Sequence, residues 1–475
     1  MPGKLYMETV GCQMSVLDSE LVVGTLRRQG YSLVSAPAGA DVVLFNTCSI
    51  RESVEEKVYL ALDSLKKLKR LNPDAVIGVL GCMAQKDQEK VFARAPHVDL
   101  VCGPGALADI PDLIATIQRT RTPQSSFSLG RKEGPRRDVE ESFASWDPER
   151  EPGGRPTPFQ AFVRTQFGCD KFCTYCIVPS VRGPEQGRDP DELCEEVRRL
   201  ADQGVVEITL VGQTVNSYRH GKLRFADLLV RLDAIPGIER IKFVSSFPND
   251  MTDDLLQAVR DLPKVAPWLH VPAQSGSDTV LARMKRHYTV GGFLEMVARA
   301  RATIPGVSIS GDFIVGFCGE TDADFQATCD LVRAGRFKSS FIYQYSTRPG
   351  TKAHTDLPDD VPLEVKKLRN NELLAVQSEV SRGITRELVG TSMEILVEGP
   401  SRRANREGFE NQLHGRTGTD HAVVFDGGEE LVGRFVTVHI EEATSLTLFG
   451  RLEGAPRTEV RTPPAPRSRL PVVLG

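Results

Sequence analysis

Three cysteines in one short loop are the residues of this sequence best suited to chemistry. Cys169, Cys173 and Cys176 lie in the stretch GCDKFCTYCIVPSVRG, separated first by three residues and then by two. A structural zinc site is closed by four protein ligands, and no further Cys or His lies near this loop in the sequence. Three thiolates on a 4Fe-4S cluster instead leave one iron open to an exogenous ligand. The spacing therefore favours an iron–sulfur cluster with a reactive position.

A second set of three cysteines is spread over the N-terminal region. Cys12, Cys48 and Cys82 each follow an apolar run that predicts a strand, in the segments VGCQMS, NTCSIRE and LGCMAQ. The carboxyl ends of parallel strands share one edge of a sheet, so these three thiols are expected to converge there. Buried core thiols are the alternative, but three strands that each end in Cys favour a second three-ligand metal site.

The elements that must position these cysteines follow from periodicity. Residues 4–118 alternate short apolar runs with helical patterns, which predicts a parallel sheet covered by helices on both faces. Residues 119–154 are rich in Pro, Gly, Ser and charge and are predicted to be a linker. Residues 155–385 contain six strand candidates separated by helices, which predicts a full or partial βα barrel with its chemistry at the carboxyl ends of the strands.

The C-terminal region changes character. Residues 388–454 hold short strand candidates with turn residues between them and no helical pattern, which predicts a small β-barrel. Residues 455–475 are rich in Pro and Arg and are expected to be a disordered tail. The fold class is therefore α/β, with three domains.

Composition limits the class of protein. The 475 residues are 40% hydrophobic and 26% charged, the apolar runs are far shorter than the roughly 20 residues that span a bilayer, and the N-terminus lacks a signal-peptide core. We therefore expect a cytoplasmic protein without a membrane segment. Cytoplasmic thiols are kept reduced, so the ten cysteines favour metal binding or redox chemistry over a disulfide framework. The net charge of −4 argues against nonspecific coating of nucleic acid but allows a local basic site.

The cysteine loop and its position after the first barrel strand resemble the radical S-adenosylmethionine superfamily. This resemblance implies that the open iron chelates S-adenosylmethionine, and that one electron cleaves the cofactor to a 5′-deoxyadenosyl radical. LVGQ, ending at Gln213, and GDFIVGFCGE, with Gly316 and Glu320, resemble the superfamily's cofactor-binding segments. Phe172 and Tyr175 in the loop are expected either to shield the cluster and pack beside a bound nucleoside, or simply to anchor the loop.

The whole of residues 4–453 resembles the methylthiotransferase family, closest to its branch that acts on N6-dimethylallyladenosine in tRNA. The matching segments include GCQMSVLDSE, NTCSIRESVEEKV, LGCMAQ, GQTVNSY and LHVPAQSGSDTVLARMKRHYT, and LHGRTGTDHAVVF resembles an RNA-binding TRAM barrel. The resemblance implies a flavodoxin-like N-terminal domain, a radical-SAM partial TIM barrel and a C-terminal TRAM domain. Ser15 stands where this branch usually has Asn.

The activity implied is methylthiolation of C2 of that adenosine at position 37 of tRNA. S-adenosylmethionine would serve as radical source and methyl donor, with one 4Fe-4S cluster on each cysteine trio. The implied partners are the tRNA anticodon stem-loop, a flavodoxin- or ferredoxin-type electron donor and a sulfur source, acting on a monomer. Alternatives are methylthiolation of threonylcarbamoyl-adenosine in tRNA or of a ribosomal-protein aspartate, and a noncatalytic iron–sulfur protein that binds RNA or senses redox state.

Other candidate residues receive simpler interpretations. Cys102, Cys194, Cys318 and Cys329 lack partner spacing and are expected to be packed thiols. Asp18 and Glu20 are expected to cap a helix, with an approach to the metal site of Cys12, Cys48 and Cys82 as the alternative. His270 either contacts substrate or cofactor or has a structural role. A local arginine cluster of the TRAM-like region is the candidate for RNA contact there: Arg402, Arg403, Arg406 and Arg416.

Overall fold

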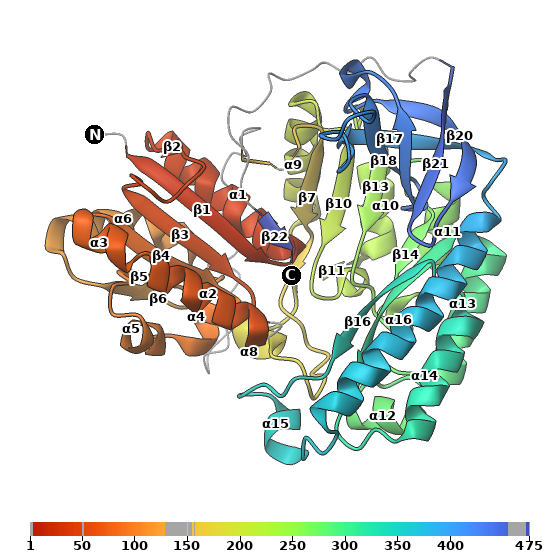
Figure 1. Cartoon of the computed structure of the whole chain (residues 1–475), viewed down its shortest axis with the longest axis horizontal. Helices are drawn as coiled ribbons and strands as arrows, with labels where there is room; N and C mark the ends of the chain where they lie inside the picture. Colours follow the sequence, from red (N-terminus) through yellow and green to blue (C-terminus); the bar gives the residue numbers. More distant parts are fainter. Residues whose placement is uncertain are drawn as a thin grey trace.

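Three bodies pack side by side in the computed structural model (Figure 1), which describes residues 3–49, 52–128, 150, 154–155, 157–454 and 472–474. An N-terminal sheet domain lies against one side of a central barrel of strands and helices. A small β-barrel lies at the top of the view, beside the same central barrel. The predicted α/β organisation in three parts is confirmed.

The N-terminal domain is a doubly wound parallel sheet. Its strands follow the order β2-β1-β3-β4-β5-β6, which is the flavodoxin-like order, and all of their pairings are parallel. The bounds are β1 (Lys4–Gly11), β2 (Ser32–Leu33), β3 (Val42–Thr47), β4 (Val76–Gly81), β5 (Leu100–Cys102) and β6 (Gln124–Ser126). One face packs on α1 (Gln13–Arg28) and α6 (Ile110–Thr120), and the other on α2 (Glu52–Ser64), α4 (Cys82–Asp87) and α5 (Lys90–Arg94).

Two segments expected to lack regular structure contribute to this sheet. Strand β6 lies inside the predicted 119–154 linker, and it pairs with β5, so the sheet extends further than the sequence pattern indicates. Strand β22 (Val472–Leu474), in the predicted disordered tail, pairs in parallel with β1. The rest of the linker from 129 to 149, residues 151–153 and residues 455–471 lie outside the described residues.

The central domain has the six predicted parallel strands in two sheets of three. The first sheet holds β7 (Gln160–Arg164), β10 (Glu207–Val211) and β13 (Arg240–Phe243), and the second holds β14 (Trp268–His270), β15 (Ser308–Val315) and β16 (Ser339–Gln344). Among the described strands no ladder joins β7 to β16, so the structure is a partial barrel that is open between its first and last strands.

Helices cover the outer face of this partial barrel and form the largest core with it. They are α9 (Pro190–Asp202), α10 (Phe225–Asp233), α11 (Asp253–Asp261), α13 (Val290–Thr303), α14 (Asp322–Gly335) and α16 (Leu363–Arg386). Shorter helices flank the carboxyl ends of the strands: α8 (Val178–Arg182), α12 (Asp278–Arg283) and α15 (Lys352–Asp356).

Helix α16 runs from the barrel into the C-terminal domain, where five strands close into a barrel in the order β17-β18-β19-β21-β20. Their bounds are β17 (Ser392–Pro400), β18 (Gln412–Thr417), β19 (Ala422–Asp426), β20 (Phe435–Ala443) and β21 (Thr447–Glu453). Full closure removes exposed strand edges from this small domain. No helix within the described ranges is both long and apolar enough to cross a membrane.

Candidate functional site

Backbone hydrogen bonds hold the cysteine loop that follows β7. The Cys169 N–H donates to the Gly183 carbonyl, and the Cys176 N–H donates to the Cys173 carbonyl, each at 3.1 Å. Gly168 has a φ of +67°, and a Cβ at this position would lie 1.8 Å from the Pro184 carbonyl oxygen. Only glycine fits this turn, and the turn sets the direction in which the first cysteine enters the loop.

Groups from distant elements contact the thiols of Cys169, Cys173 and Cys176, which we call the loop trio. Thr214 Oγ1, one residue after Gln213, lies 3.4 Å from Cys169 Sγ. The Arg286 guanidinium donates from Nη1 to Cys173 Sγ at 3.3 Å. Burial raises the pKa of Cys169 and of Cys176, so these thiols hold their protons until a metal replaces them.

The two aromatic residues of the loop take different positions. Tyr175 is partly buried against the cluster that contains Phe317, and its ring meets the edge of Phe317 with centroids 6.3 Å apart, so Tyr175 anchors the loop. Phe172 has a left-handed φ of +50° and is 39% exposed, with the Lys285 ammonium 5.8 Å from its ring centroid. Of the two alternatives, anchoring therefore describes Tyr175, whereas shielding of a bound group stays a prediction for Phe172.

Of the remaining predicted cofactor residues, Gln213 has an acceptor that a ligand could use, whereas Glu320 is hydrogen-bonded within the protein. The Gln213 side-chain oxygen is buried without a hydrogen-bond partner in the described structure, next to Thr214 at the loop trio. A buried acceptor of this kind fits a ligand that brings a donor, such as an amino group. Glu320 instead accepts from the Gly316 N–H and from Arg369, both at 2.8 Å, and so shapes its own turn. Cofactor contact by Gly316 and Glu320 stays a prediction.

The sheet edge brings together Cys12, Cys48 and Cys82, which we call the N-terminal trio. Cys12 stands at the N-cap of α1, Cys48 follows β3, and Cys82 opens α4. A hydrogen bond with Cys48 lowers the pKa of Cys12 to about 5, and the Arg182 cation adds to this effect. The Cys12 thiol therefore gives up its proton more readily than an ordinary thiol, as metal binding requires, whereas burial raises the pKa of Cys82.

The two trios share one domain junction. Cys82 packs in a buried cluster with Ile177 and Val181, from the segment that follows Cys176 directly. Residues of α1 pack with Cys12 against the inner side of the partial barrel, in a cluster that contains Met14, Leu17, Leu21, Phe162, Val211, Val244 and Trp268. Helix α1 therefore extends from the N-terminal trio onto the barrel wall, and the N-terminal domain covers the barrel beside the loop trio.

Buried ion pairs fix this junction. Asp18 on α1 accepts from Arg164 of β7 at 2.7 Å and from Arg182 of α8 at 2.8 Å. Glu20 pairs with Arg150 at 2.9 Å, and Arg150 also binds Glu196 of α9 at 2.8 Å. The prediction that Asp18 and Glu20 cap a helix is wrong, because both carboxylates face the barrel and join the two domains.

These arginines are the residues that the sequence interpretation missed. Arg164, Arg182 and Arg150 carry no motif of their own, and Arg150 lies in the predicted linker. The available signal was on the other side of the junction, in Asp18 and Glu20, which stand between the apolar residues of α1. Buried acidic residues need a partner, so their positions indicate that a basic surface packs there.

The inner face of the second barrel sheet is lined by polar and aromatic groups. His270 Nδ1 accepts the Ser245 N–H at 3.1 Å, which leaves Nε2 to donate to Asp312 at 3.2 Å. The strand register places Phe341 beside Asp312, on the same face of the sheet. The Phe341 and Tyr343 rings are nearly parallel, with an interplanar angle of 13°, and Phe341 is 62% exposed. This pair offers a flat apolar surface inside the open side of the barrel.

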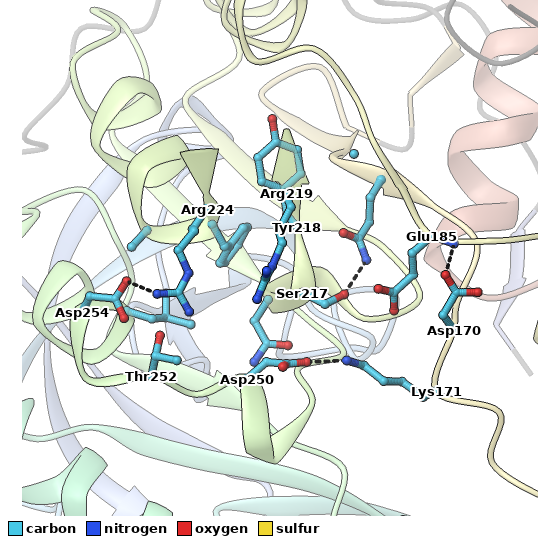
Figure 2. A pocket seen from close by; sticks show the side chains of 16 residues that line it. Asp170, Lys171, Glu185, Ser217, Tyr218, Arg219, Arg224, Asp250, Thr252 and Asp254 are labelled. Carbon is cyan, nitrogen blue, oxygen red and sulfur yellow. Dashed lines mark hydrogen bonds and ion pairs between the residues drawn. The ribbon is translucent and has the colours of Figure 1, made fainter. Parts of the chain in front are cut away.

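A polar cavity of about 350 Å³ adjoins the cysteine loop, and Asp170 and Lys171 of the loop are among its lining residues (Figure 2). Among its charged side chains, Lys171 pairs with Asp250 at 2.7 Å and Arg224 lies 3.6 Å from Asp254. None of the described residues that line it is a cysteine. We therefore place the candidate chemistry at the trios rather than in this cavity.

The C-terminal domain is attached to the barrel through Asp420. This carboxylate pairs with Lys338 at 2.9 Å, with Arg416 at 3.1 Å and with Lys242 at 3.5 Å. Arg416, expected among the RNA-contacting arginines, is therefore held at the domain junction by Asp420. The other three are exposed or half-buried on the surface of the small barrel: Arg402, Arg403 and Arg406.

The four remaining cysteines are buried, as expected for packed thiols: Cys102, Cys194, Cys318 and Cys329. Within the described ranges, no three Cys, His, Asp or Glu side chains surround a single-ion position. The three thiols of each trio are the donor set that a 4Fe-4S cluster with one open iron would use.

The comparisons with known proteins cover almost all of the chain. Residues 4–103 match Uncharacterized protein family UPF0004, residues 163–332 the Radical SAM superfamily and residues 386–452 the TRAM domain. A tRNA-2-methylthio-N(6)-dimethylallyladenosine synthase of Rhodopirellula baltica is 55% identical over 95% of this chain and 96% of its own length. A protein of the same name from Moorella thermoacetica is 43% identical over 94% and 97%.

Solved structures support the fold. A radical S-adenosylmethionine methyltransferase, TsrM from Kitasatospora setae with cobalamin and a 4Fe-4S cluster bound, superposes with a TM-score of 0.53 and 13% identity, covering 74% of each chain. The same enzyme with tryptophan and a cofactor analogue gives a TM-score of 0.52 and 14% identity, covering 83% of this chain and 78% of that chain. The likeness concerns the arrangement of domains and strands.

Proposed function

We propose that this chain, which belongs to the tRNA-2-methylthio-N(6)-dimethylallyladenosine synthase family, attaches a methylthio group to C2 of N6-dimethylallyladenosine at position 37 of tRNA. The observation that carries the proposal is the meeting of two three-thiol sites at one domain junction. Two such sites distinguish sulfur insertion by a radical route from the simpler radical reactions that one site could serve.

The N-terminal trio would hold one 4Fe-4S cluster, and the loop trio would hold the other together with S-adenosylmethionine. The aromatic C–H bond at C2 has no acidic proton, so acid–base chemistry by side chains does not open it. When bound, the clusters and S-adenosylmethionine would supply the radical, the sulfur and the methyl group. The chain would supply the thiolates, and the lowered pKa of Cys12 favours the ionised form of that thiol. The buried Gln213 oxygen would accept from the cofactor, and Tyr175 would keep the loop in place.

The substrate base would enter the open side of the barrel. A base that reacts in a pocket must leave its stack, and aromatic side chains replace the stacking that it loses. Phe341 and Tyr343 present such a surface, with His270 and Asp312 on the same sheet face. Arg402, Arg403 and Arg406 on the C-terminal domain would contact the phosphates of the anticodon stem-loop.

The partners follow from the chemistry. A flavodoxin- or ferredoxin-type protein would deliver electrons, a separate donor would replace the inserted sulfur, and the chain would act as a monomer in the cytoplasm. The names of the similar proteins favour dimethylallyladenosine over threonylcarbamoyl-adenosine or a ribosomal-protein aspartate as target. They also favour an enzyme over a noncatalytic redox sensor.

The test uses the full chain reconstituted anaerobically, with about eight irons expected for two clusters. Cys176→Ala should abolish both reductive cleavage of S-adenosylmethionine and methylthiolation. Cys12→Ala should abolish methylthiolation but retain cofactor cleavage. Cys194→Ala, which removes a buried thiol outside both trios, should change neither.

A deletion strain gives a second readout. Mass spectrometry of its tRNA nucleosides should show loss of the 2-methylthio group from dimethylallyladenosine. Normal levels of that nucleoside would refute the proposed target. Full methylthiolation by Cys12→Ala would refute the role of the N-terminal trio.

A further inference from the structure

One residue of the barrel domain contacts the N-terminal trio directly. Arg182, at the end of α8, donates from Nε to Cys82 Sγ at 3.3 Å. Its side chain is only 4% exposed, so water does not compete for this hydrogen bond. The cysteine belongs to one domain and the guanidinium to the other, so the contact exists only when the two domains are docked.

The position of Arg182 is fixed independently of the sulfur. Its Nη2 donates to Asp18 at 2.8 Å, and Arg164 holds the second oxygen of that carboxylate at 2.7 Å. The planar guanidinium therefore points one N–H group at the carboxylate and another at the sulfur.

We infer that Arg182 is a positioning residue for the cluster on the N-terminal trio, donating across the domain junction to Cys82 Sγ and raising the reduction potential of that cluster. This inference rests on the proposed function, because it requires iron at the N-terminal trio. An N–H donor withdraws electron density from a ligating sulfur and stabilises the more negatively charged reduced state. It also ties the cluster's potential to domain docking.

The loop trio offers an internal comparison. Arg286 donates from Nη1 to Cys173 Sγ at 3.3 Å, so each trio receives an arginine hydrogen bond. Arg286 belongs to the same domain as its cysteine, whereas Arg182 does not. Substitutions of the two arginines should therefore affect different clusters, and only Arg182 should link a cluster to the neighbouring domain.

The experiment compares variants of the reconstituted full-length enzyme by redox titration followed by electron paramagnetic resonance. In Arg182→Met the N-terminal cluster should need a lower potential, by at least the tenfold change in reduced-to-oxidised ratio that equals about 59 mV for one electron. The potential of the loop cluster should not change. Arg286→Met should show the converse pattern.

Arg240→Met is the matched control, because Arg240 is also a buried arginine of the barrel in an ion pair, with Glu207, but within the described structure it contacts neither the N-terminal domain nor a cysteine of either trio. It should leave the potential of the N-terminal cluster unchanged. An equal fall in Arg240→Met would show a general effect of removing a buried arginine and would overturn the inference. A wild-type potential in Arg182→Met with full iron content would overturn it as well.

If the Arg182→Met variant does not assemble its clusters, the Arg182→Lys variant tests the inference in its place. Lysine can keep the charge beside Asp18, but it lacks the rigid fork that serves the carboxylate and the sulfur together. A lowered potential is again expected, and a wild-type value overturns the inference. Absence of iron from the N-terminal trio of the wild-type enzyme would instead refute the proposed function, so the two failures are distinguishable.

Discussion

Replacement of Asp18 by asparagine tests whether buried charge holds the two cysteine-bearing domains together. The Asp18 side chain is fully buried and accepts from Arg164 and Arg182 at 2.7 and 2.8 Å. An asparagine side chain has nearly the same shape, but it carries no charge and only one acceptor oxygen. Two buried guanidinium groups would then share a neutral amide, and one would lose its hydrogen bond.

The expected cost is about 3 kcal/mol, the lower end of the roughly 3–5 kcal/mol for breaking a buried ion pair, because the amide oxygen still satisfies one arginine. A chain of three domains does not unfold in one step, so the loss should appear as weaker docking of the N-terminal domain. Since 1.4 kcal/mol is about tenfold, amide exchange in α1 should accelerate about a hundredfold.

Hydrogen exchange followed by mass spectrometry measures this directly on α1 and β7 peptides. Asp63→Asn is the control, because Asp63 pairs with Lys66 on the exposed surface of the same domain. That variant should exchange as the wild type does. Protection of α1 in Asp18→Asn within about threefold of wild type would refute the reasoning, because the ion pairs would then contribute nothing to docking.

Three further predictions concern the loop, the barrel interior and the C-terminal domain. Gly168→Ala should halve the iron content by emptying the loop trio, because its Cβ would collide with the Pro184 carbonyl; two clusters by iron analysis would contradict this. Phe341→Ala should weaken binding of substrate tRNA by about 1–3 kcal/mol through lost base stacking, with cluster content unchanged, and unaltered tRNA affinity would exclude the base from this surface. Burial lowers the pKa of His421 to about 4, so below pH 6.5 the unfolded state binds a proton that the folded state does not. Stability should therefore fall by about 3 kcal/mol between pH 6.5 and 4, and His421→Gln should not show that part of the fall in its unfolding midpoint.

The sequence predicts the fold well where periodicity is strong. The alternation of apolar runs and helices in residues 4–118 and 155–385 predicts the parallel strands of both domains, because each buried strand reads as a short apolar segment. Strand β6 was missed because Gln124–Ser126 is polar and only half-buried at the sheet edge. Strand β22 was missed because its partner is β1, at the opposite end of the chain, and pairing over such a distance leaves no local pattern.

The candidate site could also be predicted only in part. Spacing predicts the loop trio, and strand ends predict the convergence of the N-terminal trio. Asp18 was misread as a helix cap because acidic residues near the start of a helix commonly have that role, whereas here its partners come from β7 and α8. Arg182 has no recognisable pattern, because its importance depends on the docking of two domains rather than on neighbouring residues.

The docking of the domains explains why the charged residues at the junction are buried. Apolar contacts of α1 alone would bring the two domains together, but they would tolerate sliding, since apolar packing is not directional. The buried ion pairs allow one arrangement of the two domains, because a shift of one domain along the other would leave a buried charge without its partner. These pairs place Asp18 between Arg164 and Arg182, and Arg150 between Glu20 and Glu196. That single arrangement is the one in which Cys82 meets Arg182 and packs against Ile177 beside the loop trio. The ion pairs thus serve to set the distance between the two sites, whatever they add to stability.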